Sequence, residues 1–270
     1  TDAQTLQSFN TDGFTLGTNY DVNGSGLNFA SWNWLGGGTA VSNTDGSITS
    51  SVSANTTSGF SVVSFTGDGS GVSSVGHGLG ITPKLIIGKN RDSSGATYGR
   101  WLVGGSAIPS FNFTNDYMVL NSSGAKATDA GGTVWHSAPT SIVVNFADFF
   151  NTSTNKYIMY CFADTSMIKC GSFVSNNTSD NAFIYTGFKP AFLIAKSTTS
   201  ANNWVMFDNK RNTFNAVDKK LYPDLNNAED TEADWDFLSN GLKLRAGYGA
   251  NTYIYMAFAE HPFVGSDGTP

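Results

Sequence analysis

The sequence predicts an all-β protein made of duplicated, jelly-roll-like β-sandwich units that follow an N-terminal hairpin. Three observations support this fold class. Helical periodicity is almost absent from the chain. Short runs of β-branched and aromatic residues are bounded by Gly, Asn, Asp and Ser, a pattern typical of strands and turns. Two long stretches also repeat one another, which indicates a duplicated unit.

Eight segments have the length and residue types of β-strands. They are Phe60–Phe65, Lys84–Lys89, Tyr117–Leu120, Ser141–Phe146, Tyr157–Ala163, Ala191–Lys196, Trp204–Asp208 and Tyr253–Ala259. Turn signals such as TGDGSG and NSSG lie between them. The acidic segment Ala228–Leu238 is the one place where we expect a short helix.

The repeat is clearest in GHGLGITPKLIIGK (Gly76–Lys89) and YTGFKPAFLIAK (Tyr185–Lys196). An alignment of the two copies matches the residues that build one corner and the strand after it. The matched pairs are Gly80 and Gly187, Pro83 and Pro190, Ile87 and Ile194, Lys89 and Lys196, and Trp101 and Trp204. Pro suits the start of a strand because it lacks an N–H group, and the preceding Gly permits a positive φ.

The repeat divides the chain into three parts. Residues 1–57 form an opening hairpin and linker, 58–164 the first copy, and 165–270 the second copy. The copies end alike, on YIMYCFAD and YIYMAFAE, and the opening NFASWNWLGG has the same shape. We therefore expect a strand at Asn28–Leu35 and core positions at Trp34, Phe162 and Phe258.

The composition bounds the possible partners. Of the 270 residues 40% are hydrophobic, enough for a core, and only 13% are charged, against about 25% in an average domain. The formal net charge of −6 argues against a nucleic-acid partner, which would require a basic face. No apolar run reaches the roughly 20 residues of a membrane helix, so membrane insertion is not expected.

Several blocks of the sequence resemble a known protein family. DGSITSSVSANTTSGFSVVSFTG, GHGLGITPKLIIGKNR, YTGFKPAFLIAK, WVMFDNKRN and YIYMAFAEHPF resemble domains of marine bacteriophage tail-fibre and virion-surface proteins, from about Asp12 to Phe263. The resemblance implies a structural protein of the virion, an adhesion element on its tail or surface, with no known catalytic residues. Other virion proteins are then its expected partners, and a homo-oligomer, with a trimer favoured, its expected assembly.

The loop after the Trp204 strand is the candidate ligand site. A Trp ring can cover the C–H face of a sugar, while carboxylate, amide and cationic groups bind its hydroxyls. The candidate residues are Trp204, Asp208, Asn209, Lys210 and Arg211, with Trp101, near Arg91 and Arg100, as the counterpart in the first copy. Alternation along the strand leaves a second interpretation open. If Trp204 faces a core, Asp208 turns inward as an Arg-paired structural group.

Other motifs have simpler structural interpretations. His77 has no second His or Cys at ligand spacing, so we expect a hydrogen bond to a turn rather than a metal or base role. The DVNGSG stretch at Asp21–Gly26 begins like a calcium loop but has Trp32 at its twelfth position, so a tight turn is expected. Cys161 and Cys170 can form at most one disulfide, and buried free thiols are the commoner state.

The functional hypothesis is therefore a virion adhesion component that contributes to binding of a host-surface glycan. No catalytic motif was found, and we expect no cofactor and no metal ion. Two alternatives remain open. One is a carboxylate-dependent tail depolymerase, because paired carboxylates such as those of Ala228–Asp236 can hydrolyse glycosidic bonds. The other is a secreted, lectin-like binding module.

Overall fold

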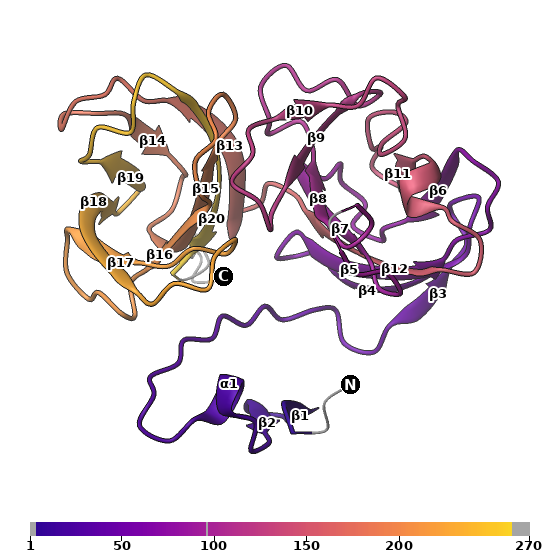
Figure 1. Cartoon of the computed structure of the whole chain (residues 1–270), viewed down its shortest axis with the longest axis horizontal. Coiled ribbons are helices and arrows are strands. Elements are labelled where there is room, and N and C mark those ends of the chain that lie inside the picture. The colour runs from indigo at the N-terminus through magenta and orange to yellow at the C-terminus, as the bar shows by residue number, and fades with distance from the viewer. Residues whose placement is uncertain (1–3, 96, 261–270) are drawn as a thin grey trace, which may run out of the picture. The chain divides into compact units, whose positions relative to one another are not determined.

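The computed structural model describes residues 4–95 and 97–260, and their regular secondary structure is almost entirely β (Figure 1). The chain divides into two units, residues 1–35 and residues 36–270. The N-terminal unit contains the antiparallel hairpin β1 (Leu6–Phe9) and β2 (Phe14–Leu16), followed by the single-turn helix α1 (Tyr20–Asn23). The side chain of Asn19 caps this helix by accepting the N–H of Asp21, so DVNGSG begins as a helical turn.

The larger unit begins with a β-sandwich. Its large sheet has the order β10-β9-β8-β7-β12-β5-β4-β3, and its small sheet pairs β11 with β6. The large sheet comprises β3 (Val41–Asn43), β4 (Ser50–Asn55), β5 (Phe60–Thr66), β7 (Leu85–Asn90), β8 (Trp101–Gly104), β9 (Asp116–Val119), β10 (Ala127–Thr128) and β12 (Lys156–Phe162), and the small sheet β6 (Ser73–Gly76) and β11 (Val143–Phe146). A 3-10 turn, η1 (Asp148–Phe150), precedes β12. Phe65 stacks on Phe146 across the core at 5.1 Å.

A second sandwich follows, and each of its sheets has four strands. Their orders are β13-β20-β15-β16 and β14-β19-β18-β17. The strands are β13 (Ile168–Val174), β14 (Phe183–Tyr185), β15 (Pro190–Ser197), β16 (Val205–Asp208), β17 (Val217–Lys220), β18 (Asp230–Leu238), β19 (Gly241–Leu244) and β20 (Thr252–Ala259). Phe173 of one sheet meets Trp235 of the other edge to face at 5.7 Å. All eight strands predicted from sequence are therefore confirmed, and so is the all-β sandwich fold.

The strand registers confirm the duplication. In the first copy β12 lies between β5 and β7, and in the second β20 lies between β13 and β15. Lys89 lies opposite Ile158 and Lys196 opposite Ile254, which are equivalent positions of the two closing strands. The corner glycines agree as well, because Gly80 has φ 71° and its counterpart in the second copy also has a positive φ.

The two copies also share two structural features that the sequence alignment did not include: a side-chain acceptor for one tryptophan N–H, and a second tryptophan in the core. The N–H of Trp101 donates to Asn121 Oδ1 at 2.9 Å, and the N–H of Trp204 donates to Asp224 Oδ1 at 3.1 Å. A second pair of tryptophans fills the two cores at equivalent positions. Trp135 lies opposite Phe146 and Trp235 opposite Leu244, and both rings are buried.

The two sandwiches meet through the outward faces of their main sheets. Phe162 of β12 contacts Phe258 of β20 edge to face at 6.0 Å. Trp204 Nε1 donates to the carbonyl of Val119 at 2.9 Å, and Lys196 Nζ donates to that of Ser123 at 3.1 Å. The predicted burial of Phe162 and Phe258 is confirmed, and the interface between the copies is its cause.

Three expectations for the chain differ from the structure. Residues 230–238 form β18 rather than a helix, because Trp235 and Phe237 pair with β19 and enter the core while the acidic first half stays exposed. Asn28–Leu35 is not a strand and Trp34 is 41% exposed, since no neighbouring strand pairs with this segment. The boundary expected at residue 58 cuts through a sheet, because β3 and β4 belong to the first sandwich.

We predict that Phe162→Ala lowers the free energy of unfolding by about 3–5 kcal/mol, the usual cost of truncating a buried aromatic. The Phe162 ring is 6% exposed and packs against Phe60 at 5.1 Å as well as against Phe258. Urea denaturation measures the change. Val174→Ala, at a 66% exposed position of β13, is the control and should shift the value by less than about 0.5 kcal/mol. A Phe162→Ala protein as stable as the wild type would contradict the conclusion that β12 stabilises the contact between the two sandwiches.

Candidate functional site

The Trp204 loop is a packed, ion-paired segment. The Trp204 ring is 2% exposed and bonds to the carbonyl of Val119 in the first sandwich. The structure therefore leaves this ring no open face on which a sugar could stack. Of the other candidates in the loop, only Lys210 is exposed.

Asp208 is the centre of this segment. Its carboxylate accepts the backbone N–H groups of Lys210 and Arg211 and pairs with Arg211 Nε at 2.6 Å. Arg211 also reaches Glu229, and Asn209 donates to Glu260. Burial raises the pKa of Asp208, but the hydrogen bonds and charge of Arg211 outweigh it, so the pKa lies below its usual value. This geometry matches the structural interpretation of Asp208, and sugar binding by the loop stays a prediction.

Trp101, the counterpart in the first copy, has different surroundings. It is half-buried on the outer face of the large sheet, where its ring stacks on Tyr160 with a centroid distance of 6.2 Å. Lys89 Nζ lies 5.6 Å from the centre of the Trp101 ring, within the range of a cation–π contact. Trp101 and Trp204 thus occupy equivalent positions, but only the second is sealed by a neighbouring sandwich.

The same outer face continues from Trp101 into a row of hydroxyl and cationic side chains. Opposed residues of neighbouring strands point to the same side of a sheet, and so do residues two apart on one strand. Lys156 lies opposite Thr66, and Arg91 donates its N–H to the carbonyl of Lys156 at 2.7 Å. Arg91 follows Lys89 by two residues, so both cations share the face that carries Trp101.

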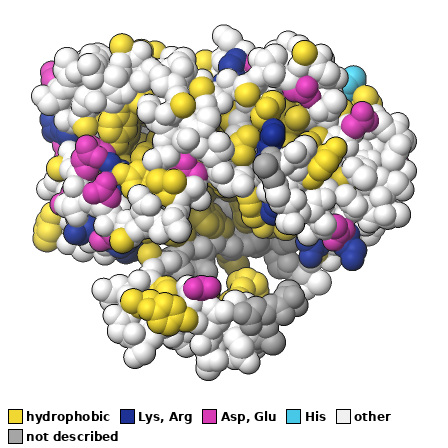
Figure 2. Space-filling view, in the orientation of Figure 1, with side chains coloured by type: hydrophobic (Ala, Val, Ile, Leu, Met, Phe, Trp, Pro, Cys, Tyr) yellow, Lys and Arg dark blue, Asp and Glu magenta, His cyan; other side chains and the backbone are white. Residues whose placement is uncertain are grey.

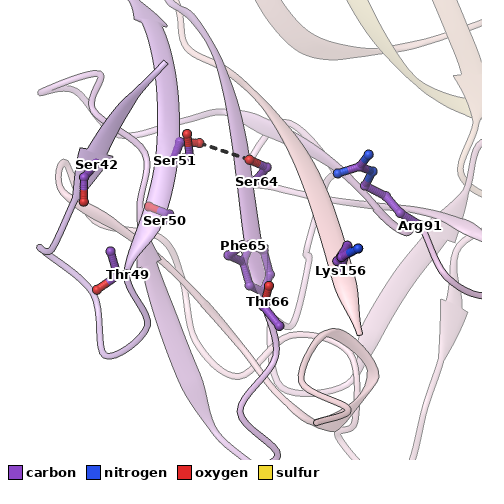
Figure 3. Close-up of a pocket in the computed structure, with 9 residues that line it drawn as sticks. All are labelled: Ser42, Thr49, Ser50, Ser51, Ser64, Phe65, Thr66, Arg91 and Lys156. Atoms are coloured by element: carbon purple, nitrogen blue, oxygen red, sulfur yellow. Dashed lines mark hydrogen bonds between the residues drawn. The ribbon is translucent and has the colours of Figure 1, made fainter. Parts of the chain in front are cut away.

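A hollow of about 440 Å³ opens on this face. We call it the basic hollow and define it by Ser42, Thr49, Ser50, Ser51, Ser64, Phe65, Thr66, Arg91 and Lys156 (Figure 3). Six of these residues carry hydroxyl groups on β3, β4 and β5 or beside them, and the two cations border them. Ser64 Oγ donates to the carbonyl of Ser51 at 3.5 Å, while Ser42 and Thr66 remain exposed.

The charge of the basic hollow contrasts with that of the whole chain. No acidic residue lines it, and neither Arg91 nor Lys156 forms a salt bridge within the described part of the chain. Figure 2 shows charged side chains scattered singly or in small groups over the face in view, amid a largely uncharged polar surface. Burial raises the pKa of Tyr160 while the charge of Arg91 opposes this effect, which places Arg91 near the Trp101–Tyr160 stack. The hollow can therefore bind anionic oxygens and hydroxyl groups beside an aromatic surface.

The carboxylates of the acidic segment, which the alternative hypothesis of a depolymerase would use, pair with neighbouring cations. Glu232 and Asp234 lie on Lys220, and Asp236 on Arg245. Burial is the main cause that raises the pKa of Asp234, to about 6. These carboxylates hold β18 to its neighbours and face no cleft found in the described residues.

The remaining reactive side chains are buried. His77 accepts the N–H of Leu79 at Nδ1, so its Nε2 carries the proton and donates to the carbonyl of Thr140 at 3.2 Å. Its expected structural role is confirmed. Cys161 and Cys170 are free thiols, and burial raises the pKa of Cys161 to about 12. Residues 4–95 and 97–260 contain no group of three His, Cys, Asp or Glu side chains that could hold a metal ion.

No helix in the described residues combines the length and the apolar character needed to cross a membrane.

Fold and surface together define an all-β protein that contains two similar β-sandwiches, one from each copy of the repeat. The chain belongs to the family described as "Domain of unknown function (DUF7483)", whose model matches residues 1–262. No curated protein and no solved structure matches the chain significantly.

Sequence reasoning named Arg91 and Trp101 but missed Lys156 and the hydroxyl groups. Lys156 is 65 positions from Arg91 along the chain, and only the β5–β12–β7 pairing brings it beside that residue. The available signal was the frequent recurrence of Ser and Thr along Ser50–Thr66, which is common in a chain this rich in both residues.

For the Trp204 loop we predict that Asp208→Ala lowers the free energy of unfolding by about 1–3 kcal/mol, because Arg211 loses the partner of its buried guanidinium edge. Thermal or urea denaturation measures the effect. Asp180→Ala, whose side chain is 92% exposed, is the control and should be nearly silent. A wild-type melting temperature for Asp208→Ala would contradict the structural role. Loss of ligand binding in Lys210→Ala, without loss of stability, would return the loop to the candidate sites.

Proposed function

We propose that this protein is an adhesion component of a bacteriophage virion, in a tail fibre or on the particle surface, that binds an acidic glycan of the host surface. The observation that carries the proposal is the basic hollow. Two cations that form no salt bridge within the described residues lie with a row of hydroxyl groups on the sheet face that also presents Trp101. Guanidinium and ammonium groups bind carboxylate and sulfate oxygens, and hydroxyl groups bind sugar hydroxyls. The resemblance of the repeats to phage domains supports the virion context.

The rigidity of the surface supports the proposal as well. The hollow is built on strands whose backbone groups are paired, rather than on a long loop, so little ordering entropy is lost when a ligand binds. A preformed, weak and polar site also suits an adhesion protein, since repeated copies on one particle multiply its affinity.

We predict that Arg91→Gln and Lys156→Gln each weaken binding of an acidic polysaccharide about fivefold, the size of a screened charge contact. The double variant should lose more. Biolayer interferometry against immobilised acidic and neutral polysaccharides measures this. The matched control is Lys189→Gln, which removes one half-exposed cation from the second sandwich.

Salt provides a second readout of the same site. Binding to the acidic polymer should fall between about 0.05 and 0.5 M NaCl, because exposed charges are screened over a Debye length of about 10 Å at 0.1 M. Unchanged affinity in the double variant, or binding without salt dependence, would overturn the hollow as the site.

We further propose that the protein forms a homotrimer and that this homotrimer contacts other virion proteins. Apolar side chains stand exposed in the N-terminal unit and suit subunit contacts, among them Phe9 at 79% and Tyr20 at 66% exposure. Sedimentation velocity at micromolar concentration should show a species of three 28.7 kDa chains, about 86 kDa in all. A monomer under these conditions would contradict the trimer without affecting the proposed glycan site.

A further inference from the structure

The first sandwich has a second hollow, of about 520 Å³, at the end of the molecule's large sheet where β8 begins. The loop before β8, the start of β9, the turn after β10 and η1 surround it. Its chemically distinctive lining residues are Tyr98, Arg100, Tyr117, Asp129, Asp148 and Phe149. We call this hollow the Tyr98 cleft. It shares no lining residue with the basic hollow.

An aromatic platform forms one wall of the Tyr98 cleft. The Tyr98 ring is 51% exposed and stacks on Phe149 with a centroid distance of 5.7 Å and an interplanar angle of 27°. Phe149 in turn meets Phe150 edge to face at 5.4 Å, and Phe150 is part of the buried core. One side of the Tyr98 ring is thus anchored to the core while the rest of the ring is open to a ligand.

Polar groups of both kinds surround the platform. Arg100 Nη1 donates to Tyr117 Oη at 3.4 Å, and its guanidinium lies 6.0 Å from the centre of that ring. Asp129 closes its own turn, because it accepts the hydroxyl of Thr133 and the N–H groups of Thr133 and Gly131. These bonds lower the pKa of Asp129, the Thr133 hydroxyl most of all. Asp148 is exposed, and within the described residues its carboxylate accepts no hydrogen bond. Asp148 is therefore the acceptor that a ligand can use.

The two copies differ at one wall of this cleft. Ala147 donates its N–H to Val134 and Arg245 donates its N–H to Asp234, so Val134 of the cleft corresponds to Asp234. In the second copy Asp234 is fully buried and lies 3.7 Å from Lys220. The equivalent position therefore carries a buried ion pair in the second copy and an apolar wall of the aromatic cleft in the first.

We propose that the Tyr98 cleft binds a neutral saccharide. The C–H face of a pyranose ring packs on the open side of Tyr98, and sugar hydroxyls donate to Asp148 and accept from Arg100. The cleft holds the carboxylates of Asp129 and Asp148 against the single guanidinium of Arg100, a formal charge of −1 that disfavours acidic sugars. The chemistry is complementary to that of the basic hollow and does not depend on it.

The test uses the full chain and a panel of neutral oligosaccharides, four to six residues long, made of hexoses or N-acetylhexosamines. A glycan array identifies the binder and isothermal titration measures its affinity. Tyr98→Ala and Asp148→Asn should each weaken binding about tenfold or more, the loss of about one aromatic or charged contact. Tyr98→Phe should retain the affinity because it keeps the ring. Raising the salt concentration should leave binding unchanged, since neither partner of the stacking contact is charged.

Matched controls lie in the second copy. Tyr185→Ala removes a 65% exposed Tyr, and Asp180→Asn neutralises an exposed carboxylate; both should bind as the wild type does. Equal melting temperatures for all variants show that each has folded. No neutral binder on the panel, or full affinity in Tyr98→Ala, would overturn the proposal. The variants of Arg91 and Lys156 should bind the neutral saccharide normally, so the failure of either site can be recognised separately.

Discussion

The whole of the larger unit depends on the closing strand of each copy, which is paired on both edges and buried along the face that points into its own sandwich. In the first copy β12 lies between β5 and β7, with Tyr157, Met159 and Cys161 fully buried inside its sandwich. The opposite face carries Phe162 to the second sandwich. A strand with no free edge and a fully buried inner face cannot slip by one residue, because a slip would turn its core side chains to the opposite face. This constraint fixes the register on which every surface site is built.

Duplication separates the part of the scaffold that is needed for folding from the part that is free to change. Both copies keep the order of four main-sheet strands, β5-β12-β7-β8 in the first and β13-β20-β15-β16 in the second. They also keep the positive φ at the corner glycine and a buried tryptophan paired with the strand before the closing one. They differ where no strand pairing demands a given residue. Trp204 is sealed against the first sandwich, whereas Trp101 stays half-buried beside Lys89. Both proposed binding sites therefore lie in the first copy, while Trp204 of the second copy packs against the first sandwich.

The two proposed sites offer different groups to a glycan. The basic hollow offers cations and hydroxyl groups on a flat sheet face, whereas the Tyr98 cleft offers a ring and a carboxylate between loops. Both are preformed and shallow, as expected for contacts that gain strength from many copies on one assembly. Neither places two free carboxylates around a bond, which is the arrangement that glycoside hydrolysis needs.

The sequence by itself determined the fold class, all eight predicted strands and the alignment of the two copies, because alternation, turn residues and repetition are local signals. It also predicted the structural role of His77, because no second His or Cys lies at ligand spacing. Tertiary structure alone decided that residues 230–238 form a strand and that Trp204 is sealed. Its strand pairing likewise placed Lys156 beside Arg91. The reason is physical: exposure and charge balance depend on which distant strands pair and which faces they cover, and no local pattern records that choice.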